Sequence, residues 1–142
     1  MKKLNLFQLC LLSLFILCGV ALVFAQISKH PRGITMNIKE VENKYGKQDF
    51  ESKKFKNGNL KIRASMATSL IQNKVLIGKT NAEIFQLLGY GDGYYFSDLI
   101  PAYLIEDNSK KDGDVWQIVF ILDRNSKVKS IHVHKNGSNL LQ

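Results

Sequence analysis

Cysteine is almost absent from this chain, and its placement excludes several classes of functional site. The sequence of 142 residues contains two cysteines, Cys10 and Cys18, and both lie in an apolar N-terminal segment. The part of the chain that follows Ala25 therefore has no cysteine at all. A disulfide framework, a cysteine-ligated metal site and thiol catalysis are excluded for that part.

Charged side chains are also missing from the run between Leu4 and Phe24, and Lys2 and Lys3 come just before it. A basic start, an apolar centre and small residues at the end are the three parts of a secretory signal peptide. An apolar run of this length is also sufficient to cross a bilayer. We therefore predict that residues 1–25 are a signal peptide or an N-terminal membrane anchor, with lipid attachment to a cysteine as a third alternative.

All three alternatives place the remaining chain outside the cytoplasm. The protein is expected to be exported, and to be periplasmic or attached to the membrane by an uncleaved N-terminal segment. The overall composition, with 45% hydrophobic and 23% charged residues, excludes a disordered tail protein. The length fits one domain with a core of its own.

The net charge of +8 includes Lys2 and Lys3, and falls to +6 without them. A basic domain often binds nucleic acid, but export argues against nucleic acid as a partner. An acidic protein or an anionic lipid surface is the better match for this charge outside the cytoplasm.

The exported chain divides into three parts. Residues 26–49 are predicted to form a linker and a short helix, because apolar residues recur there with helical spacing. These residues are Ile34, Ile38, Val41 and Tyr45. Residues 50–135 are predicted to form an α+β domain, and residues 136–142 a flexible tail.

The middle of the chain predicts a helical hairpin over residues 63–73 and 81–88. Thr80 and Glu83 have the spacing of a capping box, in which the two side chains satisfy free N–H groups at the start of a helix. Gly89 then ends the second helix. After Gly89 the sequence favours strands, because β-branched and aromatic residues replace the helical pattern.

Four short segments carry the strand signal. Residues 94–96 and 103–105 are rich in strand formers, residues 115–122 give the strongest signal, and residues 127–134 follow a turn at 123–126. The predicted fold class is therefore α+β: a helical hairpin packed on a small antiparallel sheet of about three strands, with an extra N-terminal helix.

The order of these motifs resembles a known family of small exported bacterial domains. The residues that carry the likeness are Phe50-x-Ser52, Phe55-Lys56, Arg63-x-x-Met66, Leu70, Leu76-Ile77-Gly78-Lys79-Thr80-x-x-Glu83-x-x-x-Leu87-Leu88-Gly89 and the closing Trp116 to Val128 hairpin. This pattern is similar to SmpA/OmlA-like (BamE-like) domains, whose fold is also that of β-lactamase inhibitor protein. The resemblance implies a helical hairpin on a sheet and a role in the cell envelope.

Tyrosines are concentrated around a glycine-rich turn. Tyrosine gives a large contact area at a modest entropic cost, and is favoured at recognition surfaces. The candidate partner-contact residues are Tyr90, Tyr94, Tyr95 and Tyr103. The alternative is that about half of these aromatic rings pack in the core.

Basic residues are concentrated between the short helix and the helical hairpin. The candidate basic face consists of Lys53, Lys54, Lys56, Lys61 and Arg63. Such a face could meet an anionic lipid surface or an acidic protein. The alternative is a face that only keeps the domain soluble.

No catalytic constellation is evident. Gly78-Lys79-Thr80 lacks the upstream glycine of a phosphate-binding loop, since Asn73 takes that place. No serine sits in a nucleophile-elbow pattern. The acidic residues of the strand region are expected in solvated turns: Asp92, Asp98, Glu106, Asp107, Asp112 and Asp114. His132 and His134 would share one strand face, which is either solvated or part of a metal site.

We therefore expect a non-catalytic binding or scaffolding module of the bacterial cell envelope, one that supports the assembly or stability of envelope proteins. An envelope protein is the expected partner, an anionic lipid surface is a second candidate, and no cofactor is expected. One alternative is a metal-assisted hydrolase that uses His132 and His134. Another is an inhibitor of an exported enzyme.

Overall fold

The computed structural model describes residues 33–111 and 113–136. The predictions for residues 1–25, for the first part of the linker and for nearly all of the tail lie outside the described residues. Within the described ranges, no helix combines the length and the apolar character that a membrane span requires.

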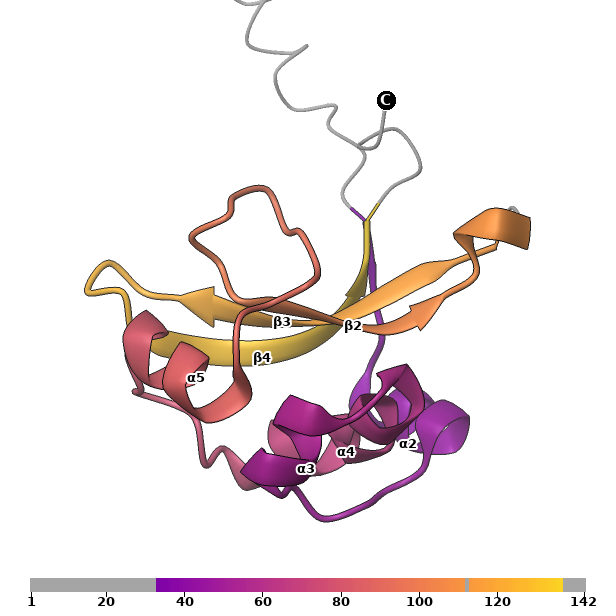
Figure 1. Ribbon diagram of the computed structural model, residues 1–142, viewed down its shortest axis with the longest axis horizontal. Coiled ribbons are helices and arrows are strands. Elements are labelled where there is room, and N and C mark those ends of the chain that lie inside the picture. The colour runs from indigo at the N-terminus through magenta and orange to yellow at the C-terminus, as the bar shows by residue number, and fades with distance from the viewer. Residues whose placement is uncertain (1–32, 112, 137–142) are drawn as a thin grey trace, which may run out of the picture. The chain divides into compact units, whose positions relative to one another are not determined.

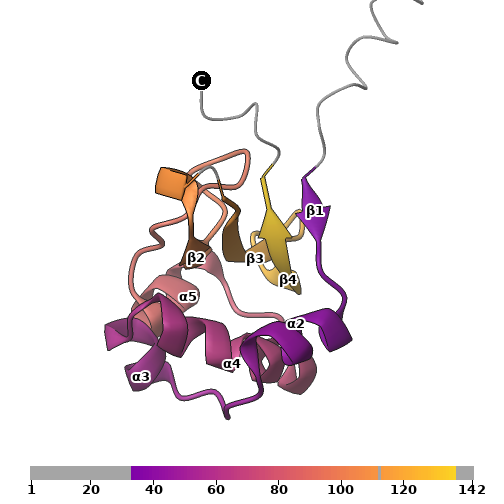
Figure 2. The same ribbon diagram turned by 90° about the vertical axis from the view of Figure 1, so that its right-hand side faces the viewer.

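Helices cover one face of a four-stranded antiparallel sheet, as Figure 1 shows. The helices are α2 (Ile38–Tyr45), α3 (Ser52–Asn57), α4 (Leu60–Asn73) and α5 (Asn81–Leu88). The strands are β1 (Ile34–Thr35), β2 (Ala102–Asp107), β3 (Val115–Leu122) and β4 (Val128–Lys135), with a 3-10 helix at Ser109–Lys111. The strand order is β1-β4-β3-β2, and the view along the sheet separates the two layers (Figure 2). The predicted α+β class is confirmed, with β1 as an additional strand.

Local sequence signals set the ends of several elements. Helix α5 begins after the predicted capping box, in which the Thr80 hydroxyl accepts from the Glu83 N–H at 3.3 Å and the Glu83 carboxylate accepts from the Thr80 N–H at 2.7 Å. The predicted helix 81–88 and the predicted strand 115–122 have the bounds of α5 and β3. A second capping box, formed by Asn37 and Glu40, begins α2.

Two local predictions need correction, and one helix was not predicted. Ile34 does not belong to the N-terminal helix, because the Asn37 cap begins α2 at Ile38, and Ile34 pairs with Lys135 in the sheet instead. The polar stretch after residue 47 contains α3, a helix with Phe55 as its buried residue. Residues 94–96 form a loop where a strand was predicted, and Phe96 has a left-handed backbone with φ of 56°.

The core contains a row of three aromatic rings between the helices and the sheet. The ring of Phe55 meets that of Tyr103 edge to face at 5.4 Å between centroids, and Tyr103 meets Phe120 at 5.8 Å. All three side chains are completely buried. Because Phe55 comes from α3, Tyr103 from β2 and Phe120 from β3, this row joins the helical layer to the centre of the sheet.

Replacement of Phe55 by alanine is expected to reduce the free energy of unfolding by about 3–5 kcal/mol, because a large buried ring leaves a cavity behind. Lys53→Ala, on the exposed side of the same short helix, is the matched control and is expected to stay within about 0.5 kcal/mol of the unmodified protein. Urea denaturation followed by circular dichroism measures both. Equal effects of the two substitutions would show that α3 does not depend on Phe55.

Candidate functional site

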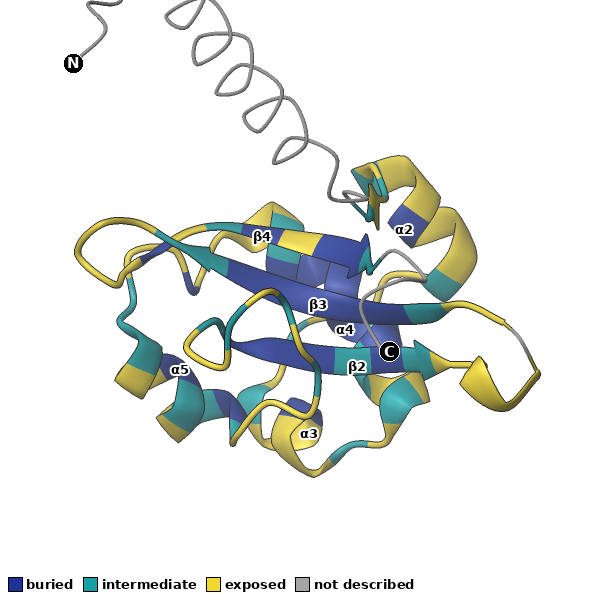
Figure 3. Ribbon diagram, turned by 90° about the horizontal axis from the view of Figure 1, so that it is seen from above, coloured by how far each residue is buried: buried dark blue, intermediate teal, exposed yellow. Residues whose placement is uncertain are grey.

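Residues 89–101 connect α5 to β2 and cross the face of the sheet that the helices leave uncovered. We call this segment the aromatic loop. It rises above the sheet in Figure 1, and Figure 3 shows it over β2 from that side, with much of its length exposed. It carries most of the tyrosines that the sequence predicts as contact residues.

The side-chain amide of Gln117 holds this loop on the sheet. Gln117 is 2% exposed on β3, where its Oε1 accepts from the Tyr94 N–H at 3.0 Å and its Nε2 donates to the Tyr94 carbonyl at 2.7 Å. The Gly93 N–H also donates to the Ala102 carbonyl at 3.0 Å. At Gly91 a Cβ atom would lie 2.3 Å from the Ala102 carbonyl oxygen, so only glycine fits there. The loop backbone is therefore fixed by hydrogen bonds and close contact.

The fixed backbone presents large apolar side chains to solvent. Tyr90 is 86% exposed, Leu99 73%, and Tyr94 and Phe96 44% each. The ring of Tyr90 lies against that of Phe85 of α5, with 5.3 Å between the centroids and an angle of 38° between the ring planes. Exposed apolar groups that gather on one segment mark interaction sites more often than isolated ones do.

The predicted contact residues separate into two groups. Tyr90 and Tyr94 are exposed, and Tyr95 is half-buried because its ring packs edge to face on His134 at 4.8 Å. Tyr103 is completely buried, and its hydroxyl donates to the Gly89 carbonyl at 2.7 Å. The prediction that Tyr103 is a contact residue is therefore wrong, because its ring is part of the core.

Leu99 belongs to the exposed surface and was not predicted. Phe96 belongs to it as well; the sequence places Phe96 in the same aromatic concentration as the tyrosines, although it was not named as a contact residue. The sequence feature that could have identified them is the turn between them. Ser97 and Asp98 are turn-forming residues that interrupt any strand pattern, so the apolar residues on either side are not expected to pack as part of a buried strand. Leu99 lies beside the start of α5, where its carbonyl accepts from the Asn81 side chain at 2.8 Å.

The candidate basic face is present in part. The exposed members are Lys53, Lys54, Lys56 and Lys61. Arg63 differs from them, because its side chain is 14% exposed and pairs with Asp92 at 2.6 Å. Arg63 thus connects α4 to the start of the aromatic loop and does not belong to an open basic surface.

The two strand histidines lie on the sheet face opposite the helices, as their spacing predicts, but they differ in burial. His132 is exposed, and its Nε2 lies 2.9 Å from the Ser130 hydroxyl. His134 is 4% exposed, and its Nδ1 lies 3.1 Å from the Thr35 hydroxyl. The expectation that both are solvated is therefore corrected for His134. Burial lowers the pKa of His134, and the charge of His132 lowers this pKa further.

Metal ligation was the alternative for these histidines. In residues 33–111 and 113–136, no group of three or more His, Cys, Asp or Glu side chains is placed to hold a metal ion. Asp123 and His30 are the only candidates that the sequence offers for a third ligand, and His30 lies outside the described residues.

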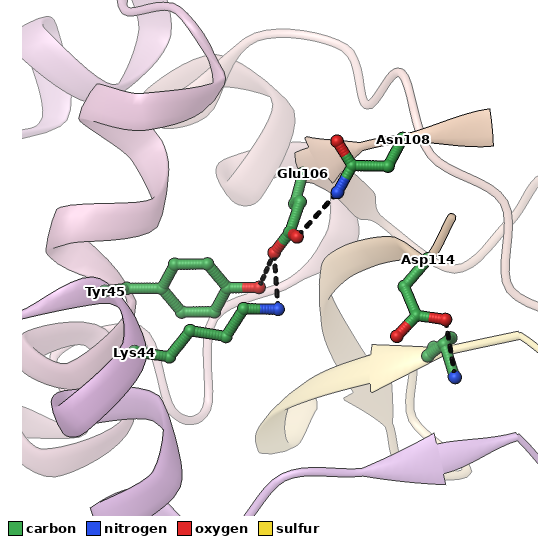
Figure 4. A network of polar contacts seen from close by, with 6 residues as sticks. Lys44, Tyr45, Glu106, Asn108 and Asp114 are labelled. Carbon is green, nitrogen blue, oxygen red and sulfur yellow. Dashed lines mark hydrogen bonds and ion pairs between the residues drawn. The ribbon is translucent and has the colours of Figure 1, made fainter. Parts of the chain in front are cut away.

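Asp112 lies outside the described residues. The described acidic residues of the strand region do not gather into one site, but Glu106 lies at the centre of a polar network (Figure 4). Its carboxylate accepts from the Tyr45 hydroxyl at 2.5 Å and the Asn108 amide at 2.8 Å, and it pairs with Lys44 at 2.7 Å. Burial acts to raise the pKa of Glu106, but the hydrogen bonds from Lys44 and Tyr45 outweigh burial and lower it. This network ties the end of α2 to β2.

The same network reaches β4 through a second ion pair. Lys135 pairs with Asp114 at 2.7 Å, and the Lys44 and Lys135 amines lie 5.2 and 5.6 Å from the centre of the Trp116 ring. Each carboxylate is neutralised by a lysine beside it. The arrangement therefore supports a structural role better than an acid–base pair with separated pKa values.

Comparison with protein-family models, with curated proteins and with solved structures finds no match to the chain. The likeness to SmpA/OmlA-like domains consequently rests on the residues quoted above.

Gln117→Ala is expected to release the aromatic loop without unfolding the sheet, because its amide bonds only to the loop backbone and to the Asn136 side chain in the described part of the chain. Amide hydrogen exchange at Tyr94 should rise by at least tenfold, while exchange at Ile118 stays unchanged. Unchanged exchange at Tyr94 would show that other contacts hold the loop.

The low pKa of His134 predicts a pH-dependent stability. The unfolded chain binds a proton near the ordinary pKa of 6.5, whereas the folded chain binds it only at a lower pH. The free energy of unfolding is therefore expected to fall as the pH drops below that value. Urea denaturation at about pH 7.5 and about pH 5.5 measures this change. His134→Gln should reduce the difference, and an equal difference in the variant would contradict the assignment.

Proposed function

We propose that residues 33–136 form a non-catalytic binding module of the bacterial cell envelope, and that the aromatic loop contacts an envelope protein. The observation that carries this proposal is the exposure of Tyr90, Tyr94, Phe96 and Leu99 on a backbone that hydrogen bonds hold in place. In this role the module supports the assembly or stability of its partner.

A fixed loop suits recognition for an energetic reason. Association costs the entropy of every loop and side chain that becomes ordered on binding, so a backbone that is already ordered retains more of its contact energy. Gln117 and Gly93 supply that order before a partner arrives. Tyrosine and leucine then add apolar contact area.

The location in the envelope is supported by the sequence. Residues 1–25 have the charge and hydropathy pattern of an export signal or anchor. The motif that ends in Leu87-Leu88-Gly89 is similar to SmpA/OmlA-like domains of the envelope. Both features point to a partner outside the cytoplasm.

The charge around the loop favours an acidic partner. Gly89, at the start of the loop, lies against the aliphatic part of Lys56, because a Cβ added at Gly89 would come within 3.5 Å of the Lys56 Cγ. Lys53 and Lys56 both belong to α3, and both are exposed. An acidic protein surface beside the apolar contact would pair with these lysines, and an anionic lipid surface is the second candidate.

The test uses affinity capture from envelope extract with three forms of the full-length protein. The loop variant carries Tyr90→Ala and Leu99→Ala. The matched control carries Val75→Ala and Ile77→Ala, which remove exposed apolar side chains elsewhere, since Val75 is 57% and Ile77 39% exposed. We expect one protein to be recovered by the unmodified and control forms and to be reduced at least tenfold with the loop variant.

Two results would contradict the proposal. Equal recovery by all three forms would exclude the aromatic loop as the contact surface. Failure of every form to recover a protein, together with an intact envelope after deletion of the gene, would exclude the binding module itself. Circular dichroism of the three forms confirms that the loop variant remains folded.

A further inference from the structure

The uncovered face of the sheet contains a hollow that the proposed contact surface does not use. The hollow measures about 310 Å³ and lies beside the aromatic loop, toward β1 and β4. Its lining residues are Thr35, Tyr95, Val119, Ile121, Lys129, Ser130, His132 and His134. Residues of the edge strand β1, of the inner strands β4 and β3 and of the loop thus line one space of the size of a small-ligand site.

Apolar side chains form one part of the lining. Val119 is completely buried and Ile121 half-buried on β3, and both point to the face opposite the core side chains Ile118 and Phe120. The ring of Tyr95 adds an aromatic surface that is held in place by its edge-to-face contact with His134. A short hydrocarbon chain would find apolar contact on this part of the lining.

Polar side chains form the other part of the lining, and the only formal charge among them is positive. Lys129 is exposed and brings the formal positive charge, while Ser130, Thr35 and His132 bring groups that can donate hydrogen bonds. No acidic residue lines the hollow. The carboxylate of Asp123 is held in the hairpin turn, where hydrogen bonds from the Lys127 and Asn125 N–H groups and then the charges of Lys127 and Lys129 lower its pKa. Lys129 forms no ion pair within the described residues.

We infer that this hollow binds a small monocarboxylate that carries a short apolar chain. The carboxylate would pair with Lys129 and accept from Ser130 or His132, while the chain would lie on Ile121 and the ring of Tyr95, above the buried Val119. One lysine balances one negative charge, whereas a phosphate dianion is better matched by two cations or a bidentate arginine. The inference concerns a site separate from the exposed loop residues Tyr90 and Leu99.

The test is a titration of the full-length protein in a nonionic detergent, followed by NMR of the backbone amides. The probe is hexanoate, and the matched probes are hexanamide, which lacks the charge, and acetate, which lacks the chain. We expect hexanoate to give saturable shifts at Ser130 and His132. Hexanamide and acetate should each bind at least tenfold more weakly.

Variants separate the site from general attraction to a basic protein. Lys129→Gln should weaken hexanoate binding at least tenfold, whereas Lys127→Gln, in the adjacent turn and outside the hollow, should change it less than twofold. Ile121→Trp fills the hollow and should abolish the shifts. Urea denaturation of each variant confirms that the fold is retained.

Two results would overturn the inference. Equal binding of hexanoate and hexanamide, or equal effects of the Lys129 and Lys127 substitutions, would overturn it. Two sources could supply the same chemistry, a free aliphatic acid or the C-terminus of a peptide. Comparison of hexanoate with N-acetyl-leucine distinguishes the two sources. If hexanoate binds more tightly, the ligand is a free aliphatic acid, and if N-acetyl-leucine binds more tightly, it is the C-terminus of a peptide.

Discussion

The packing of Tyr103 is the constraint on which both layers of the structure depend. Its ring lies between Phe55 and Phe120, so that it joins the helices to the sheet. Its hydroxyl donates to the Gly89 carbonyl, at the point where α5 ends and the aromatic loop begins. Burial raises the pKa of this hydroxyl, so it stays a donor to a higher pH than an exposed tyrosine would. One side chain thus stabilises the core and sets the starting point of the exposed loop.

The two faces of the sheet differ in how they are covered. One face is covered by helices and carries the core, including Ile118 and Val133. The other is covered only in part, by a loop that Gln117 attaches, and the remainder forms the hollow near Lys129. Exposed apolar and polar groups therefore gather on the side that contributes least to the core, where binding residues can change at a low cost in stability.

The sequence predicted the elements whose signals are local. The capping box at Thr80 and the apolar run of β3 gave correct bounds for α5 and β3, because caps and continuous strand formers act within a few residues. Helix α3 was missed because it is short and buries a single residue, Phe55. The burial of Tyr103 and the attachment of the loop to Gln117 depend on residues distant in the chain, and no local pattern reports such contacts.

The attachment of the aromatic loop has a consequence for how this surface can evolve. Gln117 bonds to the N–H and the carbonyl of Tyr94, and Gly93 bonds to Ala102 through its backbone, so these contacts require no particular side chain at positions 94 or 99. Mutations at those positions alter what is displayed without altering the scaffold that displays it. Selection can therefore retarget the surface by single substitutions, much as variable residues are exchanged on a constant framework.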